Sequence, residues 1–262
     1  MLSEPATRAS PDTGELLVHA VVGAHMALPS PGRAPEVAAG RELTLLRHGE
    51  LAVVAERIDP EHRFRVRDDL LAHSELLNAL AASGPVIPIA FGSVFPDETH
   101  IVEELLEPRQ RELTGTLGRL EGRAQFTVRA RYVQDAVLAE VVREEPEIAR
   151  LRAATRDRPE EQTHGARVRL GELVARAVDA KRQRDVDWLL MALAPLADDH
   201  RVTPGSGLDR LADVSLLVAT DRQQELEARA EDLAADWRAR ATLRLLGPLA
   251  AFDFVGEPEG AG

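Results

Sequence analysis

The segment at residues 86–95 limits the possible folds more strongly than any other part of this sequence. It is an apolar run interrupted by one proline, Pro88, and one glycine, Gly92. A proline cannot occupy the interior of a helix, and in a central strand it would remove a ladder hydrogen bond. A glycine between two apolar stretches indicates a bulge or the close approach of another part of the backbone. We therefore predict an edge strand or extended turn, with residues 86–94 as the last strand of the first half of the chain.

The residues before this segment carry the patterns of a small α+β domain. Strands are predicted at residues 16–22, 43–46 and 51–55, and the turn at residues 47–50 joins the last two as a hairpin. A helix is predicted at residues 66–82, because five residues recur at helical spacing: Val66, Leu70, His73, Leu77 and Leu80. The proline-rich residues 29–40 are expected to form a surface loop, and residues 102–106 a short helix.

The second half opens with a regular alternation of apolar and polar residues. Its apolar side is formed by Phe126, Val128, Ala130 and Tyr132, which predicts a strand with one buried face. Further strands are predicted at residues 212–219, 243–246 and 251–255. Helices are predicted at residues 135–143, 147–152, 166–181, 184–196 and 221–240. Residues 155–165 contain no apolar side chain and are expected to form an exposed, mobile loop.

This order of elements favours the α+β class with two domains. A strand, a helix, a helical excursion, a strand, a helix and a strand would suit a ferredoxin-like βαββαβ unit with a helical insertion. Its second strand has one candidate, near residues 200–202. We expect an N-terminal α+β domain at residues 15–112 and a C-terminal modified ferredoxin-like domain at residues 113–255. A disordered tail is expected at residues 1–14 and a flexible tail at residues 256–262.

Composition narrows the functional class. Of the 262 residues, 44% are hydrophobic and 29% charged, as in soluble globular proteins, and no apolar run approaches the roughly 20 residues of a membrane-spanning helix. The absence of cysteine excludes disulfides and thiolate chemistry and makes the cytoplasm the expected compartment. A net charge of −12 argues against general nucleic-acid binding, although it leaves room for a local arginine patch. Lys181 is the only lysine.

The sequence contains no phosphate-binding loop, dinucleotide fingerprint, zinc-protease helix or nucleophile elbow. His19 and His25 are the nearest pair of histidines, and solvated or hydrogen-bonded rings are favoured there over a metal site. His73 lies on the apolar stripe of its helix, so we expect a core histidine that donates to a backbone carbonyl. No catalytic residue, cofactor or metal is predicted.

Several of these segments occur in the same order in one known family. They are the helix with His73, the segment at residues 86–94, the pair Leu105 and Leu106, the strand that ends at Tyr132, and the terminal segment that begins at Gly247. From about residue 16 to residue 255 the sequence therefore resembles the gas vesicle protein F/L family (GvpF/GvpL). Ala90 departs from the family pattern, which usually has an arginine there. Structural roles are expected for eight motif positions: His73, Pro88, Phe91, Gly92, Tyr132, Gly247, Pro248 and Phe254.

The resemblance implies a non-enzymatic accessory or minor structural protein of gas vesicles, located in the cytoplasm at the vesicle. Its implied partners are the small hydrophobic shell protein and other vesicle proteins, bound during assembly, with no role for nucleic acid or membrane. An acidic protein with extended edge segments and amphipathic helices could shield an aggregation-prone subunit. The alternative is an enzyme or small-ligand regulator built on ferredoxin-like domains, which would need a concave site with convergent polar groups.

Overall fold

The computed structural model describes residues 14–28, 42–59 and 65–256. The loop expected at residues 29–40 and most of both expected tails lie outside these described residues. Contacts divide the chain into two compact units: Met1–Gly122 with Ala250–Gly262 is the first unit, and Arg123–Leu249 is the second unit. Among the described residues, no helix combines the length and apolar character needed to cross a membrane.

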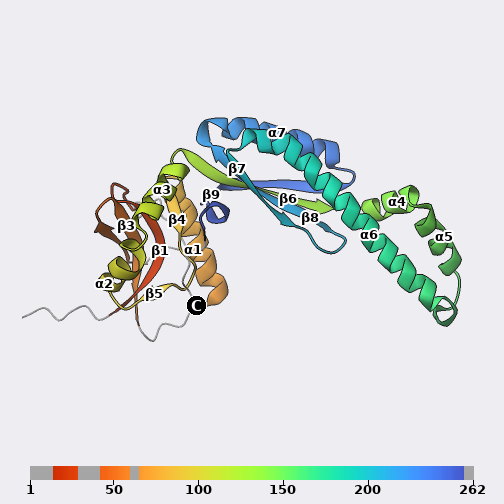
Figure 1. The fold of residues 1–262 in the computed structure, drawn as a ribbon, viewed down its shortest axis with the longest axis horizontal. Coiled ribbons are helices and arrows are strands. Elements are labelled where there is room, and N and C mark those ends of the chain that lie inside the picture. Colours follow the sequence, from red (N-terminus) through yellow and green to blue (C-terminus); the bar gives the residue numbers. More distant parts are fainter. Residues whose placement is uncertain (1–13, 29–41, 60–64, 257–262) are drawn as a thin grey trace, which may run out of the picture. The chain divides into compact units, whose positions relative to one another are not determined.

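The first unit contains a five-stranded antiparallel sheet (Figure 1). Its path is β2-β3-β1-β4, and β5 also pairs with β1. The strands are β1 (Glu15–Gly23), β2 (Leu43–His48), β3 (Leu51–Ile58), β4 (Val86–Pro88) and β5 (Val94–Phe95). The helices are α1 (Val66–Ala81), α2 (Glu98–His100), the π-helical η2 (Ile101–Leu106), α3 (Gln110–Leu120) and the 3₁₀ turn η5 (Phe252–Phe254).

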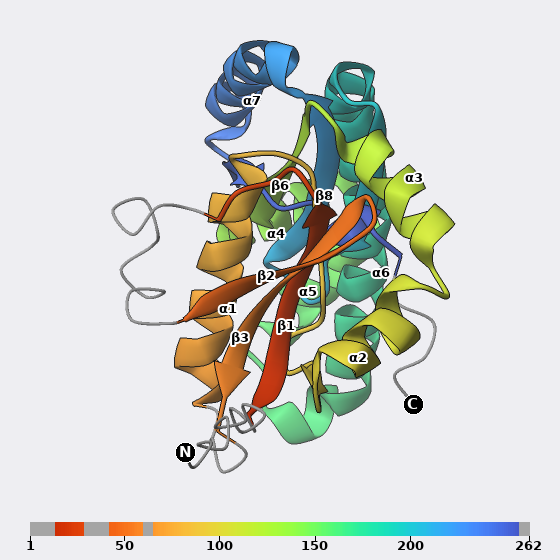
Figure 2. The same cartoon turned by 90° about the vertical axis from the view of Figure 1, so that its left-hand side faces the viewer.

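Helices cover both faces of this sheet, with α1 on one side and α3 on the other (Figure 2). On the α1 side, Leu76, Leu77 and Leu80 pack against small and branched residues of β1 and β3. The pairing of β1 with β3 slips at His19: Val18 pairs with Ala55, but Ala20 pairs with Val54. His19 is therefore the extra residue of a β-bulge, a device that re-aims a side chain within a strand.

The structure confirms the hairpin of β2 and β3, the strand β1 and the helix α1, corrects two predictions and adds one helix. Residues 86–94 are two short strands, β4 and β5, separated by a turn. The buried face of α1 is Ala72, His73, Leu76, Leu77 and Leu80, so Val66 and Leu70 are exposed. Helix α3 went unpredicted, because Gly115 and Gly118 within it lower helix propensity.

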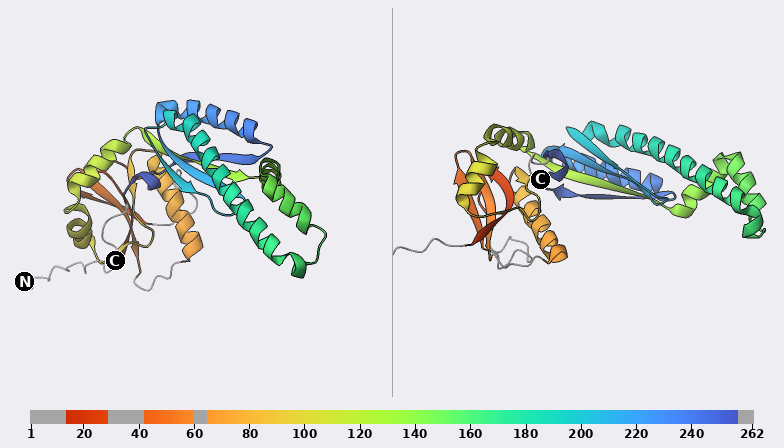
Figure 3. Two further views of the ribbon diagram at one scale, coloured as in Figure 1. Left: turned by 45° about the vertical axis from the view of Figure 1, so that its right-hand side comes forward. Right: turned by 60° about the horizontal axis from the view of Figure 1, so that its bottom comes forward.

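The second unit contains a four-stranded antiparallel sheet in the order β7-β8-β6-β9 (Figure 3). The strands are β6 (Arg123–Tyr132), β7 (Asp199–Pro204), β8 (Arg210–Ala219) and β9 (Ala241–Leu249). The helices are α4 (Gln134–Glu144), α5 (Pro146–Thr155), α6 (Glu160–Leu193) and α7 (Gln223–Trp237), with short 3₁₀ turns η3 (Ala194–Leu196) and η4 (Thr220–Arg222). Helices α6 and α7 pack on one face of the sheet, where Phe126, Leu189 and Leu233 share a core.

The second strand expected near residues 200–202 is confirmed as β7. The separate helices at residues 166–181 and 184–196 are wrong, because α6 is one helix of 34 residues. The expected loop shrinks to residues 156–159, since α6 already begins at Glu160. Residues 251–255 are not a strand: β9 continues through Gly247 and Pro248, which are joined by a cis peptide bond, and the chain then turns into η5.

Charged residues that are buried inside the second unit explain why α6 continues where the sequence pattern predicts two helices. Lys181, Arg182 and Asp185 interrupt the apolar stripe of the sequence, yet each is about nine-tenths buried. Lys181 bonds to two glutamates of α4, at 2.8 Å from Glu140 and 3.3 Å from Glu144. An apolar stripe that stops therefore marks a buried ionic cluster here rather than the end of a helix.

Candidate functional site

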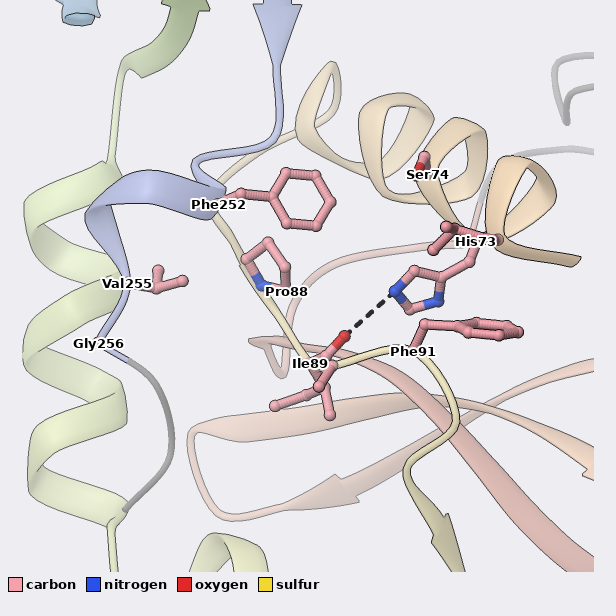
Figure 4. Close-up of a pocket in the computed structure, with 10 residues that line it drawn as sticks. His73, Ser74, Pro88, Ile89, Phe91, Phe252, Val255 and Gly256 are labelled. Atoms are coloured by element: carbon pink, nitrogen blue, oxygen red, sulfur yellow. Dashed lines mark hydrogen bonds between the residues drawn. The ribbon is translucent and has the colours of Figure 1, made fainter. Parts of the chain in front are cut away.

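The candidate site is a pocket of about 280 Å³ in the first unit. Three segments line it: the middle of α1, residues 88–91 after β4, and residues 252–256 at the end of the described chain (Figure 4). Most of its surface is apolar, with Leu70, Pro88, Phe91, Phe252 and Val255 contributing side chains. The pocket therefore favours an apolar occupant.

Residues 90–93 form a turn that fixes one wall of the pocket. Ser93 donates to the carbonyl of Ala90 through both its backbone N–H, at 3.2 Å, and its hydroxyl, at 2.8 Å. Gly92 has φ +88°, as position i+2 of a type II turn requires, and a Cβ there would meet no other atom within 4 Å. Gly92 is thus needed for its backbone conformation and not for the close approach of another chain segment.

Ile89 is held from both sides of its peptide. Its N–H donates to the carbonyl of His19 at 3.0 Å, and its own carbonyl accepts from Nε2 of His73 at 3.1 Å (Figure 4). His73 is only 3% exposed. The prediction of a core histidine that donates to a backbone carbonyl is confirmed.

The tautomers of the two buried histidines follow from this bond. Because a carbonyl can only accept, Nε2 of His73 carries the hydrogen, and in a neutral ring Nδ1 is then an acceptor. Nδ1 of His19 lies 2.9 Å from Nδ1 of His73 and, with that tautomer, donates a hydrogen bond to it. Nε2 of His19 lies 3.5 Å from a carboxylate oxygen of Glu56 and has no hydrogen-bond partner within the described part of the chain. The pair His19–His73 thus links the bulge in β1 to the pocket wall.

Both nitrogens of His73 are therefore engaged inside the protein. The imidazole ring of His73 lies at the pocket and packs edge-on against the ring of Phe91, with the two ring centroids 5.6 Å apart. Ser74 is the other polar side chain of the lining. With neither a free base nor a convergent set of polar groups, the pocket is suited to holding an apolar group rather than to proton transfer.

The last described residues close the third side of the pocket. The N–H of Ala250 donates to the side-chain oxygen of Asn78 at 2.9 Å, which ties this segment to α1. Phe252 is 40% exposed and Val255 lies near it, both toward the lining residue Pro88 (Figure 4). An apolar side chain left partly in water at a pocket rim is available to a partner.

The structure brings together His73, Pro88 and Phe91 of the motif residues, with Gly92 in the adjoining turn. Phe254 lies in η5 but does not line the pocket. Sequence reasoning missed His19, Leu70 and Phe252 as site residues. In the sequence these three residues are only apolar or histidine side chains within predicted strands or helices. Ordinary core residues look the same, so nothing marked these three as site residues.

The other three motif residues, Tyr132, Gly247 and Pro248, belong to the second unit. The hydroxyl of Tyr132 donates to Asp185 at 2.5 Å, and burial together with this bond raises the pKa of Tyr132 above its ordinary value. A Cβ on Gly247 would lie 2.5 Å from the ring of Phe126, so only glycine fits against that ring. Tyr132 and Gly247 thus both contact buried residues of the second unit.

Metal-binding geometry does not occur among the described residues: none of their His, Asp or Glu side chains form a group of three suited to an ion. His19 and His25 are the nearest pair of histidines in the sequence. In the structure, however, Nδ1 of His19 lies 2.9 Å from Nδ1 of His73. The described part of the chain thus gives no observation that points to a metal centre.

Comparison with protein families adds an independent observation. The sequence model of the family described as "Gas vesicle synthesis protein GvpL/GvpF" matches residues 16–256. The chain is 32% identical over 211 residues to "Gas vesicle protein F" of Streptomyces sp. (strain CB03234), covering 80% of this chain and 87% of the relative.

Two solved structures share the fold. GvpF from Anabaena sp. PCC7120 superposes with a TM-score of 0.74 at 16% identity, covering 95% of this chain and 99% of that one. GvpF from Microcystis aeruginosa gives a TM-score of 0.73 at 15% identity, covering 92% and 99% respectively. Because the sequence identities are this low, the two structural similarities support the fold and nothing beyond it.

Proposed function

Because the chain belongs to the gas vesicle synthesis protein GvpL/GvpF family, we propose that it is a non-enzymatic accessory protein of gas vesicle assembly. In this proposal it binds the hydrophobic shell protein and other vesicle proteins in the cytoplasm, at the growing vesicle. Neither nucleotide nor metal takes part.

The apolar pocket of the first unit carries the proposal. Leu70 and Phe252 lie at its lining with 45% and 40% of their surface exposed. A volume of about 280 Å³ accommodates one or two large apolar side chains. Apolar anchors that enter such a pocket contribute much of the binding free energy in protein complexes. A hydrophobic shell subunit could supply these anchors.

A small-ligand regulator or enzyme remains the alternative, because the pocket is also large enough for a small molecule. Such sites position their ligands with a few polar groups. Here His73 directs both ring nitrogens into the protein, which disfavours a polar ligand.

We also propose that the second unit is a modified ferredoxin-like unit. The strand order β7-β8-β6-β9 supports this assignment, with β7 and β8 joined as a hairpin and helices in both crossovers. The insertion is then formed by α4, α5 and the part of α6 up to Val178, which share a small core of Val141, Ile148 and Val178.

Binding of purified shell protein to pocket variants tests the function. Leu70→Glu and Phe252→Glu place a charge at the pocket and should weaken binding at least about tenfold, since a buried carboxylate without a partner is strongly disfavoured. Leu71→Glu is the matched control, on the same helix and 55% exposed but outside the lining.

The control should bind like the unsubstituted protein, and a chelator should leave the complex intact. Equal losses for Leu70→Glu and Leu71→Glu would remove the pocket from the proposal. Loss of the complex in chelator would contradict metal-free binding. Tighter binding of a small apolar ligand than of shell protein would favour the alternative.

A further inference from the structure

The second unit carries a concentration of positive charge on the sheet face opposite its core. Arg129 of β6 pairs across the ladder with Asp213 of β8 on one side and with Arg244 of β9 on the other. Residues paired in this way share a face of the sheet. The flanking positions of β6 and β9, Val128, Ala130, Leu243 and Leu245, point into or pack against the core. These charged residues therefore lie on the face away from α6 and α7.

One carboxylate serves several guanidinium groups on this face. Asp213 accepts from Arg131 at 2.7 Å, whereas its contacts with Arg129 and Arg210 are both 3.9 Å. We call Arg129, Arg131, Arg210 and Arg244, together with Asp213, the arginine face. This set holds four cations and one anion, and three of the four cations contact that anion.

This excess of positive charge stands out in a chain whose total net charge is −12. Arg129, Arg210 and Arg244 are exposed, and Arg131 is half-buried. Like charges directly opposite each other on neighbouring strands are destabilising, and the pair Arg129 and Arg244 has this geometry. An anionic occupant would relieve that repulsion.

We propose that the arginine face is a docking surface for a carboxylate-rich segment of another protein. Guanidinium groups bind carboxylates through two parallel hydrogen bonds, and neighbouring strands present them at intervals of about 5 Å. A partner chain with glutamate or aspartate at similar intervals complements this array. The site lies on a different unit from the apolar pocket, so it would recruit a partner other than the apolar anchor.

A nucleic acid fits this face less well than an acidic protein. Single strands are bound by aromatic side chains that stack on bases as well as by cations. In the four strands of the second unit, all of whose residues the structure describes, the aromatic residues are Phe126 and Tyr132, and both belong to the core on the other face. The arginine face therefore offers charge and bidentate geometry without a stacking platform.

The experiment measures the binding of a fluorescent octaglutamate peptide to the whole chain at low salt. Arg129→Gln with Arg244→Gln should lower the affinity about tenfold, because two charge-assisted contacts are lost. The matched control is Arg150→Gln with Arg176→Gln, which removes the same charge from exposed positions on α5 and α6. The control should change the affinity less than about twofold, and added salt should weaken binding of the unsubstituted protein.

The melting temperature of an Arg244 variant distinguishes a docking role of Arg244 from a structural role. The single variant Arg244→Gln should melt at the same or a higher temperature than the unsubstituted protein while binding the peptide more weakly, and Arg244→Lys should retain part of the affinity. A lower melting temperature for Arg244→Gln would assign Arg244 a structural role and overturn the proposal.

Three other results would also overturn it: equal losses for the two double variants, tighter binding of single-stranded RNA of equal charge, or self-association that the arginine variants abolish. Absence of peptide binding would do the same. Because these substitutions leave the first unit unchanged, shell-protein binding at the apolar pocket can succeed or fail independently.

Discussion

The two units satisfy their buried polar groups in different ways. In the first unit, Nδ1 of His19 and Nδ1 of His73 lie 2.9 Å apart, and Nε2 of His73 donates to the carbonyl of Ile89. In the second unit, charges are buried in pairs: Lys181 lies between two glutamates, and Arg240 binds Asp185 at 2.6 Å. The first arrangement fixes the backbone of one short segment, and the second joins α4, α6 and the start of β9.

This difference sets the expected cost of losing one partner. An unpaired neutral group that stays buried costs about 1–3 kcal/mol, whereas removing one partner of a buried ion pair costs about 3–5 kcal/mol. The second unit should therefore be the more sensitive to single substitutions at its polar residues.

The largest effect is expected for Asp185→Ala. Asp185 is 8% exposed and accepts from both Tyr132 and Arg240, so its loss leaves the hydroxyl without its partner and leaves Arg240 with the longer contact to Glu140, at 3.6 Å. We expect the free energy of unfolding in urea to fall by about 3–5 kcal/mol. Asp187→Ala, at an exposed position two residues along α6, should change it by less than about 0.5 kcal/mol. Similar small losses for both would break the comparison.

His73→Leu should have an intermediate effect of about 1–3 kcal/mol. It removes the donor to the carbonyl of Ile89 and the acceptor for His19, but leaves no uncompensated charge. His25→Leu is the control, because His25 is exposed in the same unit. A loss from His73→Leu that exceeds that of Asp185→Ala would reverse the ranking of the two units.

Gly92→Val tests whether the backbone, rather than a side chain, is the sensitive part of the pocket wall. A β-branched residue at φ +88° is strained by about 1–3 kcal/mol, and nothing in the surroundings compensates. Ala90→Arg, at an exposed position of the same turn, should change stability by less than about 0.5 kcal/mol. The melting temperatures of Gly92→Val and Ala90→Arg are compared. Equal losses for the two variants would contradict the assignment of Gly92 as a special backbone position.

The smallest effect is expected from an exposed pair in the first unit. His100 and Asp97 lie 2.9 Å apart, which raises the pKa of His100 and lowers the pKa of Asp97. The contribution of His100 is therefore present below its ordinary pKa and is lost as pH rises through the raised value. That of Asp97 is present above its ordinary pKa and is lost as pH falls through the lowered value.

Because both side chains are exposed, stability should hardly respond, and the readout is titration by NMR. Asp97→Asn should move the pKa of His100 back toward its ordinary value. A midpoint for His100 that does not move in this variant would show that the pair does not form in solution.

Sequence patterns predicted the elements that depend on local spacing. The hairpin of β2 and β3 and the carbonyl partner of His73 follow from the turn between two apolar runs, from periodicity and from the cost of burying a polar ring. The strand β7 was expected for a different reason, because the ferredoxin-like order of elements requires a second strand. The proline and glycine at residues 88 and 92 correctly marked an irregular strand end, although one strand was expected where the chain forms two.

Features that depend on distant partners could not be predicted. The bulge at His19 is defined only by the register of β3, and Phe252 reaches the pocket from the far end of the chain. The continuity of α6 rests on glutamates of α4 that neutralise Lys181. In each case the deciding contact joins residues whose proximity no local pattern encodes.

The burial of Lys181 has a practical consequence for work on this protein. It is the only lysine in the sequence, and its side chain is 10% exposed between two glutamates. Amine-reactive cross-linkers, which are commonly used to map partners, will therefore find almost no side-chain target in this chain, and a negative result with them carries no information about contacts. Carboxylate-directed reagents suit it better, because the acidic residues are numerous.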